Sequence, residues 1–151
     1  MAKNQELFED VQIGFRNFSG AESQFNRAGD RNYVIFLEEN RARQLEAEGW
    51  NVKWPKDRDF GPDEEDHRNP YLPVDANFNN YPPKIVMLIN DNPTLLDESN
   101  IDVLDWSEIE RVDAVIRPYH WEVNGKSGVK AYTKSLYVTI KSDIFQERYG
   151  I

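Results

Sequence analysis

Residues 111–140 read RVDAVIRPYHWEVNGKSGVKAYTKSLYVTI, and this stretch decides the fold. Two alternating segments flank Asn124-Gly125, a dipeptide whose residues tolerate the positive φ angles of a type I′ turn. The pattern therefore predicts two antiparallel β-strands joined by a tight turn. Alternation places two sets of side chains on one face of their strands: Arg117, Tyr119 and Trp121 on the first, and Lys130, Tyr132 and Lys134 on the second.

These two sets combine positive charge with aromatic rings. A single-stranded nucleic acid needs cations for its phosphates and flat π surfaces for bases that lack stacking partners. Aromatic residues are also common in β cores, so packing in the core is an equally good interpretation of Tyr119 and Trp121. Core packing does not explain the interleaved cations, which are seldom buried. The pattern as a whole favours a nucleic-acid-binding surface.

The charge of the whole chain speaks against that interpretation. A net charge of −9 and a pI near 4.7 are unusual for a protein that neutralises phosphates. However, the acid is segregated: residues 57–66 carry six acidic side chains and residues 91–113 carry eight. Residues 114–141 hold five cations against Glu122 alone. A local positive surface on an acidic protein is therefore possible, and local potential is what a bound strand feels.

The remaining sequence predicts short strands with one helix. At 151 residues and 39% hydrophobic content, the chain is long enough for one domain with a substantial core. Residues 38–48 are good helix formers ended by Gly49. The expected strands are residues 11–18, 32–37, 50–54, 72–78 and 84–89, with a loop at 55–70 and an acidic connector at 91–110 that holds one helical turn at 106–110, capped by Ser107.

We therefore expect a mainly β fold: a five-stranded antiparallel OB-like barrel with one helix and long acidic loops, as a single domain over residues 1–151. In the last strand, side chains at alternate positions should all lie on one face, but their chemistry changes along the strand. Its outward residues Lys130, Tyr132 and Lys134 run into the apolar Leu136 and Val138 at the same spacing. This conflict predicts a β-bulge near Ser135, or a strand that passes from the barrel rim into the core.

Motifs for catalysis or metal binding are missing. The absence of cysteine excludes disulfides, thiol nucleophiles and cysteine zinc sites, and it fits a reducing cytoplasm. Acids at 57–66 with His67 do not have the spacing of a calcium loop, so they are interpreted as solvated charges. Phosphate-binding loops and nucleophile elbows are absent, as are apolar runs that could cross a membrane. We expect no enzyme activity, no cofactor, no metal and no membrane partner.

Several motifs have a familiar arrangement. The terminal hairpin contains Pro118-Tyr119 and Gly125-Lys-x-Gly128, followed by Leu-x-Val-x-Ile over residues 136–140. Residues 15–18, 25–27 and 31–33 have the character of a first hairpin and its loop. In these features, which cover about half of the chain, the sequence resembles phage single-stranded DNA-binding proteins of the OB-fold type. Many of those proteins recruit partners through an acidic tail, whereas this chain ends FQERYGI.

The resemblance implies binding of single-stranded DNA with little sequence preference, in phage DNA replication or recombination in the host cytoplasm. Replication or recombination proteins are further expected partners, through the internal acidic segments. The alternative is an acidic protein-interaction module or a DNA-mimic inhibitor, which the net charge favours. The sequence leaves the oligomeric state, the site size and the choice of DNA or RNA open. The expected nucleic-acid-binding residues are Arg16, Phe18, Arg27, Arg31, Arg117, Tyr119, Trp121, Lys126, Lys130, Tyr132 and Lys134.

Overall fold

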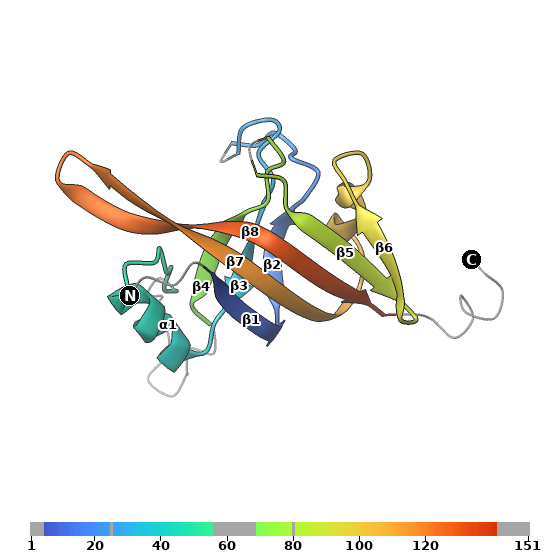
Figure 1. The fold of residues 1–151 in the computed structure, drawn as a ribbon, viewed down its shortest axis with the longest axis horizontal. Helices are drawn as coiled ribbons and strands as arrows, with labels where there is room; N and C mark the ends of the chain where they lie inside the picture. Colours follow the sequence, from blue (N-terminus) through green and yellow to red (C-terminus); the bar gives the residue numbers. More distant parts are fainter. Residues whose placement is uncertain (1–4, 25, 56–68, 80, 142–151) are drawn as a thin grey trace, which may run out of the picture.

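In the part of the chain that the structure describes, the fold is mainly β with one α-helix (Figure 1). The computed structural model describes residues 5–24, 26–55, 69–79 and 81–141. Within these ranges the elements are β1 (Glu6–Val11), β2 (Ile13–Asn17), β3 (Asn32–Phe36), α1 (Glu39–Ala47), β4 (Tyr71–Asp75), β5 (Lys84–Ile89), β6 (Asn92–Leu96), the 3-10 helix η1 (Ile101–Asp105), β7 (Ile109–Val123) and β8 (Lys126–Ile140).

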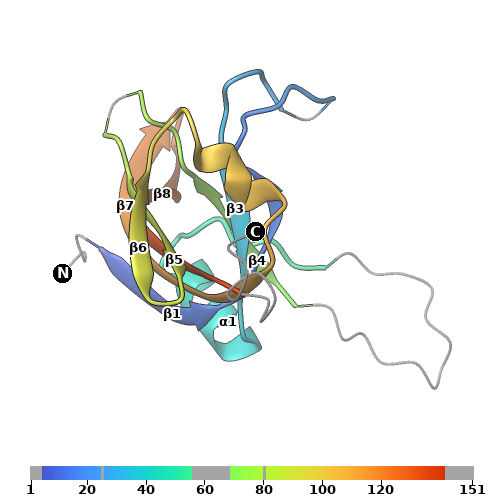
Figure 2. The same ribbon diagram turned by 90° about the vertical axis from the view of Figure 1, so that its right-hand side faces the viewer.

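The strands form one mixed sheet in the order β1-β7-β8-β4-β3-β2, with β5 paired to β8 and β6 paired to β5. The end strands β1 and β2 are consecutive in the chain and separated by Gln12 alone, so the sheet curls back on itself (Figure 2). Strand β8 runs antiparallel to β7 but parallel to β4 and β5. The predicted five-stranded antiparallel barrel is therefore wrong in strand number and in strand direction. Local alternation reveals strands, but it does not reveal which distant strand becomes the neighbour.

The terminal hairpin is confirmed. Strands β7 and β8 have 15 residues each and pair from Ile109–Ile140 to Val123–Lys126. The turn residues Asn124 and Gly125 have φ angles of 52° and 78°, as a type I′ turn requires. The two strands extend well beyond the rest of the molecule as an arm, at the upper left of Figure 1.

The predicted bulge is also confirmed. Val115 pairs with Ser135, and the next residue of β7 pairs with Thr133, so Lys134 is an extra residue in β8. On the turn side of this bulge the odd-numbered residues, such as Thr133, face the core; beyond it the even-numbered ones, such as Leu136, do so. One inserted residue thus reverses the parity of β8 and resolves the conflict between its polar and apolar halves.

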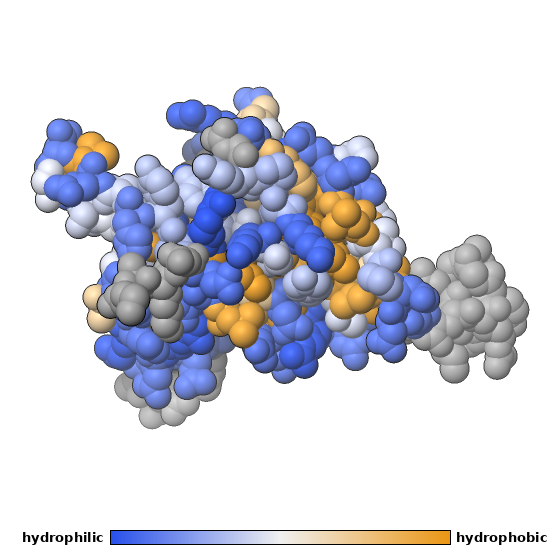
Figure 3. Space-filling view, viewed as in Figure 1, coloured by the Kyte–Doolittle hydropathy of each residue, from blue (hydrophilic) through white to orange (hydrophobic). Residues whose placement is uncertain are grey.

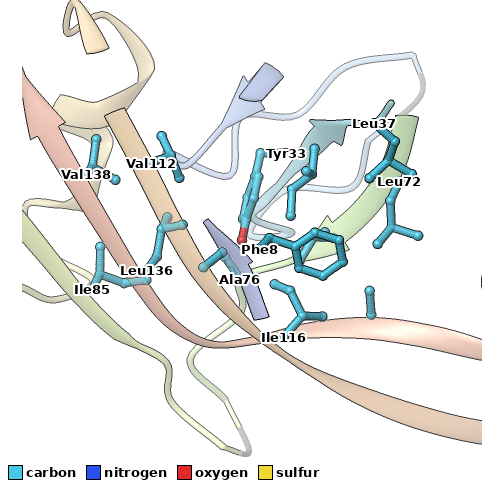
Figure 4. Close-up of a cluster of buried hydrophobic side chains, with 14 of the residues drawn as sticks. Phe8, Tyr33, Leu37, Leu72, Ala76, Ile85, Val112, Ile116, Leu136 and Val138 are labelled. Atoms are coloured by element: carbon cyan, nitrogen blue, oxygen red, sulfur yellow. The ribbon is translucent and has the colours of Figure 1, made fainter. Parts of the chain in front are cut away.

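The core lies inside the curled sheet. Phe8, Tyr33, Ile116 and Leu136 come from four different strands and meet there (Figure 4). Tyr33 is 1% exposed, and burial raises the pKa of its phenol far above the usual range. The α1 helix matches the predicted 38–48 segment and contributes Ala42 and Leu45 to the same core, both fully buried.

Other local predictions differ from the structure. Strand β1 covers residues 6–11, where only a polar start was expected. Residues 50–54 form isolated bridges in place of a strand. The acidic connector contains β6 and η1, and the expected helical turn at 106–110 is wrong, because β7 begins at Ile109 and the hydroxyl of Ser107 donates back to the carbonyl of Val103. Most of the predicted 55–70 loop lies outside the described residues.

Candidate nucleic-acid interface

An open groove lies beside the terminal hairpin. Its volume is about 750 Å³, and we call it the hairpin groove. The side chains come from β7, β8, the end of β4 and the segment 76–83 that connects β4 to β5. The lining residues are Asp75, Asn77, Asn79, Tyr81, Arg117, Pro118, Tyr119, Lys130 and Tyr132.

The strand register brings the aromatic and basic residues together. Arg117 lies directly opposite Tyr132, and Tyr119 lies opposite Lys130, so all four side chains leave the same face of the hairpin. The rings of Tyr119 and Tyr132 pack edge to face with centroids 6.0 Å apart. The guanidinium carbon of Arg117 lies 4.4 Å from the ring centroid of Tyr81. Tyr119 is 56% exposed, so more than half of its surface is accessible to a ligand.

A carboxylate balances part of this positive charge. The Nζ atom of Lys130 lies 3.0 Å from Oδ2 of Asp75 and 5.3 Å from the ring centroid of Tyr132. The hydrogen bond to Asp75 raises the pKa of Lys130 above its usual value, so its side chain remains a cation at neutral pH. The lining residues include two cations and one carboxylate, so the net positive charge of the groove is small. Three tyrosine rings line the same groove.

The hairpin arm continues the same face beyond the groove. Trp121 lies opposite Gly128, and its indole rests on that glycine: a Cβ atom at residue 128 would stand 2.8 Å from the ring. Trp121 is 37% exposed, so it is not a core residue. Lys126 is exposed opposite Val123 at the end of the arm, a narrow and largely hydrophilic projection in Figure 3. Both predicted residues therefore lie on the arm, outside the groove lining.

Two residues predicted in the first hairpin do not line the hairpin groove. Phe18 is 0% exposed and stacks on Tyr33 with ring centroids 5.2 Å apart, so it belongs to the core. Arg16 is partly buried, and its Nη1 donates to the carbonyls of Leu104 and Ser107 at 2.8 and 2.9 Å, which fastens η1 to β2. The cause is local: Phe15 has a φ of 45°, which interrupts the strand alternation on which the predictions rested.

The remaining predicted cations are dispersed. Arg31 is 16% exposed in its side chain and lies 3.9 Å from Glu98, although its backbone NH donates to Oδ1 of the groove residue Asn77. Arg27 lines a separate shallow pocket in the loop between β2 and β3. Lys134 donates to the side chain of Gln5 at 2.9 Å, outside the groove lining. Of the eleven predicted residues, the groove brings together Arg117, Tyr119, Lys130 and Tyr132.

The sequence predictions missed the groove residues at the end of β4 and in the segment that follows it. Asp75, Asn77, Asn79 and Tyr81 line the groove, although the sequence was interpreted there as strand and extended connection. The available signal was the aromatic Tyr81 directly before Pro82-Pro83, in a stretch rich in asparagine. Asparagine and proline favour turns and loops, so a tyrosine among them is expected in an exposed loop.

Among the residues that the structure describes, none form a group of three or more histidine or acidic side chains suited to a metal ion. The acidic cluster at 57–67 falls outside those residues. Across the described ranges, every helix is too short or too polar to span a membrane.

Three solved structures of one phage protein have a similar fold. The C-terminally truncated single-stranded DNA-binding protein from bacteriophage Enc34 aligns with a TM-score of 0.58 and 11% identity, over 93% of this chain and 87% of that one. Its complex with single-stranded DNA gives 0.58 and 12% over 93% and 88%. A further structure gives 0.54 and 9% over 97% and 86%. This chain therefore shares its fold with that phage protein.

The sequence identifies the family more directly. The model of the family described as "Putative phage ssDNA-binding domain" matches residues 2–151. This chain belongs to that family, and the resemblance seen in its sequence is confirmed. No curated protein sequence matches it significantly.

Proposed function

We propose that this protein binds single-stranded DNA in the hairpin groove, by base stacking combined with a few phosphate contacts. One observation carries the proposal: the rings of Tyr119 and Tyr132 are flanked by Arg117 and Lys130 in one open groove. Single strands expose base faces that tyrosine rings can cover, and every base has such a face. The family membership and the fold support the same ligand class.

The groove favours single strands over duplex. Stacked duplex bases have no free faces, so Tyr119 and Tyr132 would gain nothing from them. Stacking is also tolerant of sequence, so we expect little base preference. Because Arg117 and Lys130 are the two cations of the groove lining, few phosphates are neutralised and affinity falls only gently with salt.

The proposed role is that of a non-enzymatic binding protein in phage DNA replication or recombination, built as one domain over residues 1–151. The family match over residues 2–151 supports the single domain. The acidic segment 91–113, which includes η1, is the proposed contact for replication or recombination proteins. The host cytoplasm is the proposed location.

The test is a fluorescence anisotropy titration of labelled thymidine oligonucleotide against wild type, Tyr119→Ala and Trp106→Ala. Trp106 is 74% exposed and lies outside the groove lining, which makes it a matched control. Losing one stacked ring should weaken binding by about 1–3 kcal/mol in Tyr119→Ala and leave the control unchanged. Absence of binding by the folded wild type would favour the DNA-mimic alternative. Equal affinity for duplex would refute the stacking mode.

A further inference from the structure

A second group of aromatic rings lies on the outer face of β2, β3 and β4. Phe15, Phe36 and Tyr71 contact one another with centroid distances of 6.2, 5.6 and 6.2 Å, and we call them the aromatic triad. Phe36 and Tyr71 lie opposite each other on β3 and β4. Strands β2, β3 and β4 lie side by side in Figures 1 and 2, so the triad spans three neighbouring strands.

The triad is exposed at a local cost in free energy. Phe15 is 70% exposed and has a φ of 45°, a conformation that bulky residues rarely adopt. Gly14 makes room for its neighbour, because a Cβ atom there would stand 2.5 Å from the ring of Phe36. Backbone strain that holds a large ring in water indicates a functional surface more than a packing need.

The triad and the hairpin groove share one strand face. Leu72 and Val74 of β4 are buried, so Tyr71, Pro73 and Asp75 point outward together. Asp75 lines the groove and Tyr71 belongs to the triad. Four residue steps along an extended strand separate Tyr71 from Asp75 by roughly 13 Å. The step between the two sites is short enough for one single strand to cross.

The charged residues on the two sides of the triad differ in sign. Lys53 is exposed and exchanges two backbone hydrogen bonds with Tyr71, at 2.8 and 2.9 Å, so a cation stands beside the triad. Beyond Phe36, a separate pocket is lined by Glu9, Asp10 and Glu38. Its arginine, Arg41, is already engaged by Glu6 at 2.7 Å. Phosphates are favoured up to the triad and repelled beyond it.

We propose that the triad is a second stacking site, and that a single strand bound in the hairpin groove continues along β4 to reach it. This inference rests on the proposed function and adds the course and the length of the bound strand. Two stacking sites on one face make affinity depend on oligonucleotide length, because a short strand fills the groove without reaching the triad.

The experiment compares thymidine oligonucleotides of about 4 and about 12 residues, within the range of site sizes of such folds. Phe15→Leu keeps apolar bulk but removes the ring, and Phe15→Tyr restores the ring. Phe15→Leu should weaken binding of the longer strand at least about fivefold, the effect of losing one modest stack. Binding of the shorter strand should stay within twofold, and Phe15→Tyr should behave as wild type. Thermal melting confirms that each variant is folded.

The outcomes separate the two proposals. If Tyr119→Ala weakens both oligonucleotides while Phe15→Leu and Tyr71→Leu bind the longer one like wild type, the triad is not a binding site. If Phe15→Leu alters self-association in sedimentation but not DNA affinity, the triad is a protein contact and the inference is overturned. If Tyr119→Ala has no effect on either strand, the groove proposal itself fails.

Discussion

The hydroxyl of Tyr33 lies 2.9 Å from the hydroxyl of Thr133, and the two groups form a buried hydrogen bond between β3 and β8. Thr133 faces the core because it precedes the bulge at Lys134, whereas the residues beyond the bulge have the opposite parity. The pair is therefore a sensitive reporter of the register of β8.

Alkaline pH should weaken the fold through Tyr33. Burial raises the pKa of its phenol far above the usual value, so the native state keeps a proton that the unfolded chain releases near pH 10. The stabilising effect is complete below that pH and declines as pH rises further, by about 1.4 kcal/mol per pH unit. Urea unfolding between about pH 9 and pH 11 measures this decline. In Tyr33→Phe it should be shallower, and an identical slope would contradict the assignment.

The bulge should matter more than the side chain that occupies it. Lys134 is exposed, and its hydrogen bond is to the exposed side chain of Gln5. Lys134→Ala should therefore change the free energy of unfolding by less than about 0.5 kcal/mol. Deletion of Lys134 removes the parity change and should cost more than about 4 kcal/mol, because one half of β8 would turn its core residues outward. Similar stability of the two variants would show that the register can slip without penalty.

Local signals identified most of the β7–β8 hairpin. Asn124-Gly125 defined the turn, and the clash between polar and apolar parity located the bulge within one residue of Ser135. The β5–β6 hairpin turns at Asn90 and Asp91, both with positive φ, but that dipeptide is a weaker turn signal than Asn-Gly. Parallel pairing of β8 with β4 and β5 depends on contacts between distant segments, which alternation does not encode.

In the candidate site too, local sequence predicted some residues, whereas others depend on the course of the folded chain. Four of the groove residues on the hairpin, Arg117, Tyr119, Lys130 and Tyr132, were predictable because opposite positions in a two-stranded ladder share a face. Phe18 was misassigned because one residue with positive φ, Phe15, breaks the alternation of its strand. Tyr81 was missed because it lies in a loop. The path of the loop backbone places it in the groove, and the alternation of side chains along a strand cannot predict that path.

Trp121 should contribute to binding without supporting the core. It is 37% exposed and rests on Gly128, so Trp121→Ala should lower the free energy of unfolding by less than the roughly 3–5 kcal/mol typical of a buried aromatic ring. If the arm takes part in DNA binding, the variant should lose about 1–3 kcal/mol of affinity. Parallel thermal melts and anisotropy titrations measure both quantities. Lost stability with full affinity in the folded fraction would mean that the ring only packs.

The two groove cations should set the salt dependence of binding. Each phosphate contact to a single strand adds about 0.7 to the slope of log affinity against log salt, so Arg117→Gln and Lys130→Gln should each lower the slope by that amount. The raised pKa keeps Lys130 protonated, so the slope should not change between about pH 6 and pH 9.

The carboxylate of Asp75, beside Lys130, should weaken DNA binding. Asp75→Asn removes the carboxylate that lies 3.0 Å from the Lys130 ammonium and competes with a phosphate for it. Affinity should then rise by up to about fivefold, in line with the roughly 1 kcal/mol of an exposed ion pair. Asp102→Asn, an exposed acid on η1 and outside the groove lining, changes the net charge equally and serves as the control. Equal gains in the two variants would mean that the strand responds to the charge of the whole protein, and that Lys130 is not a phosphate contact.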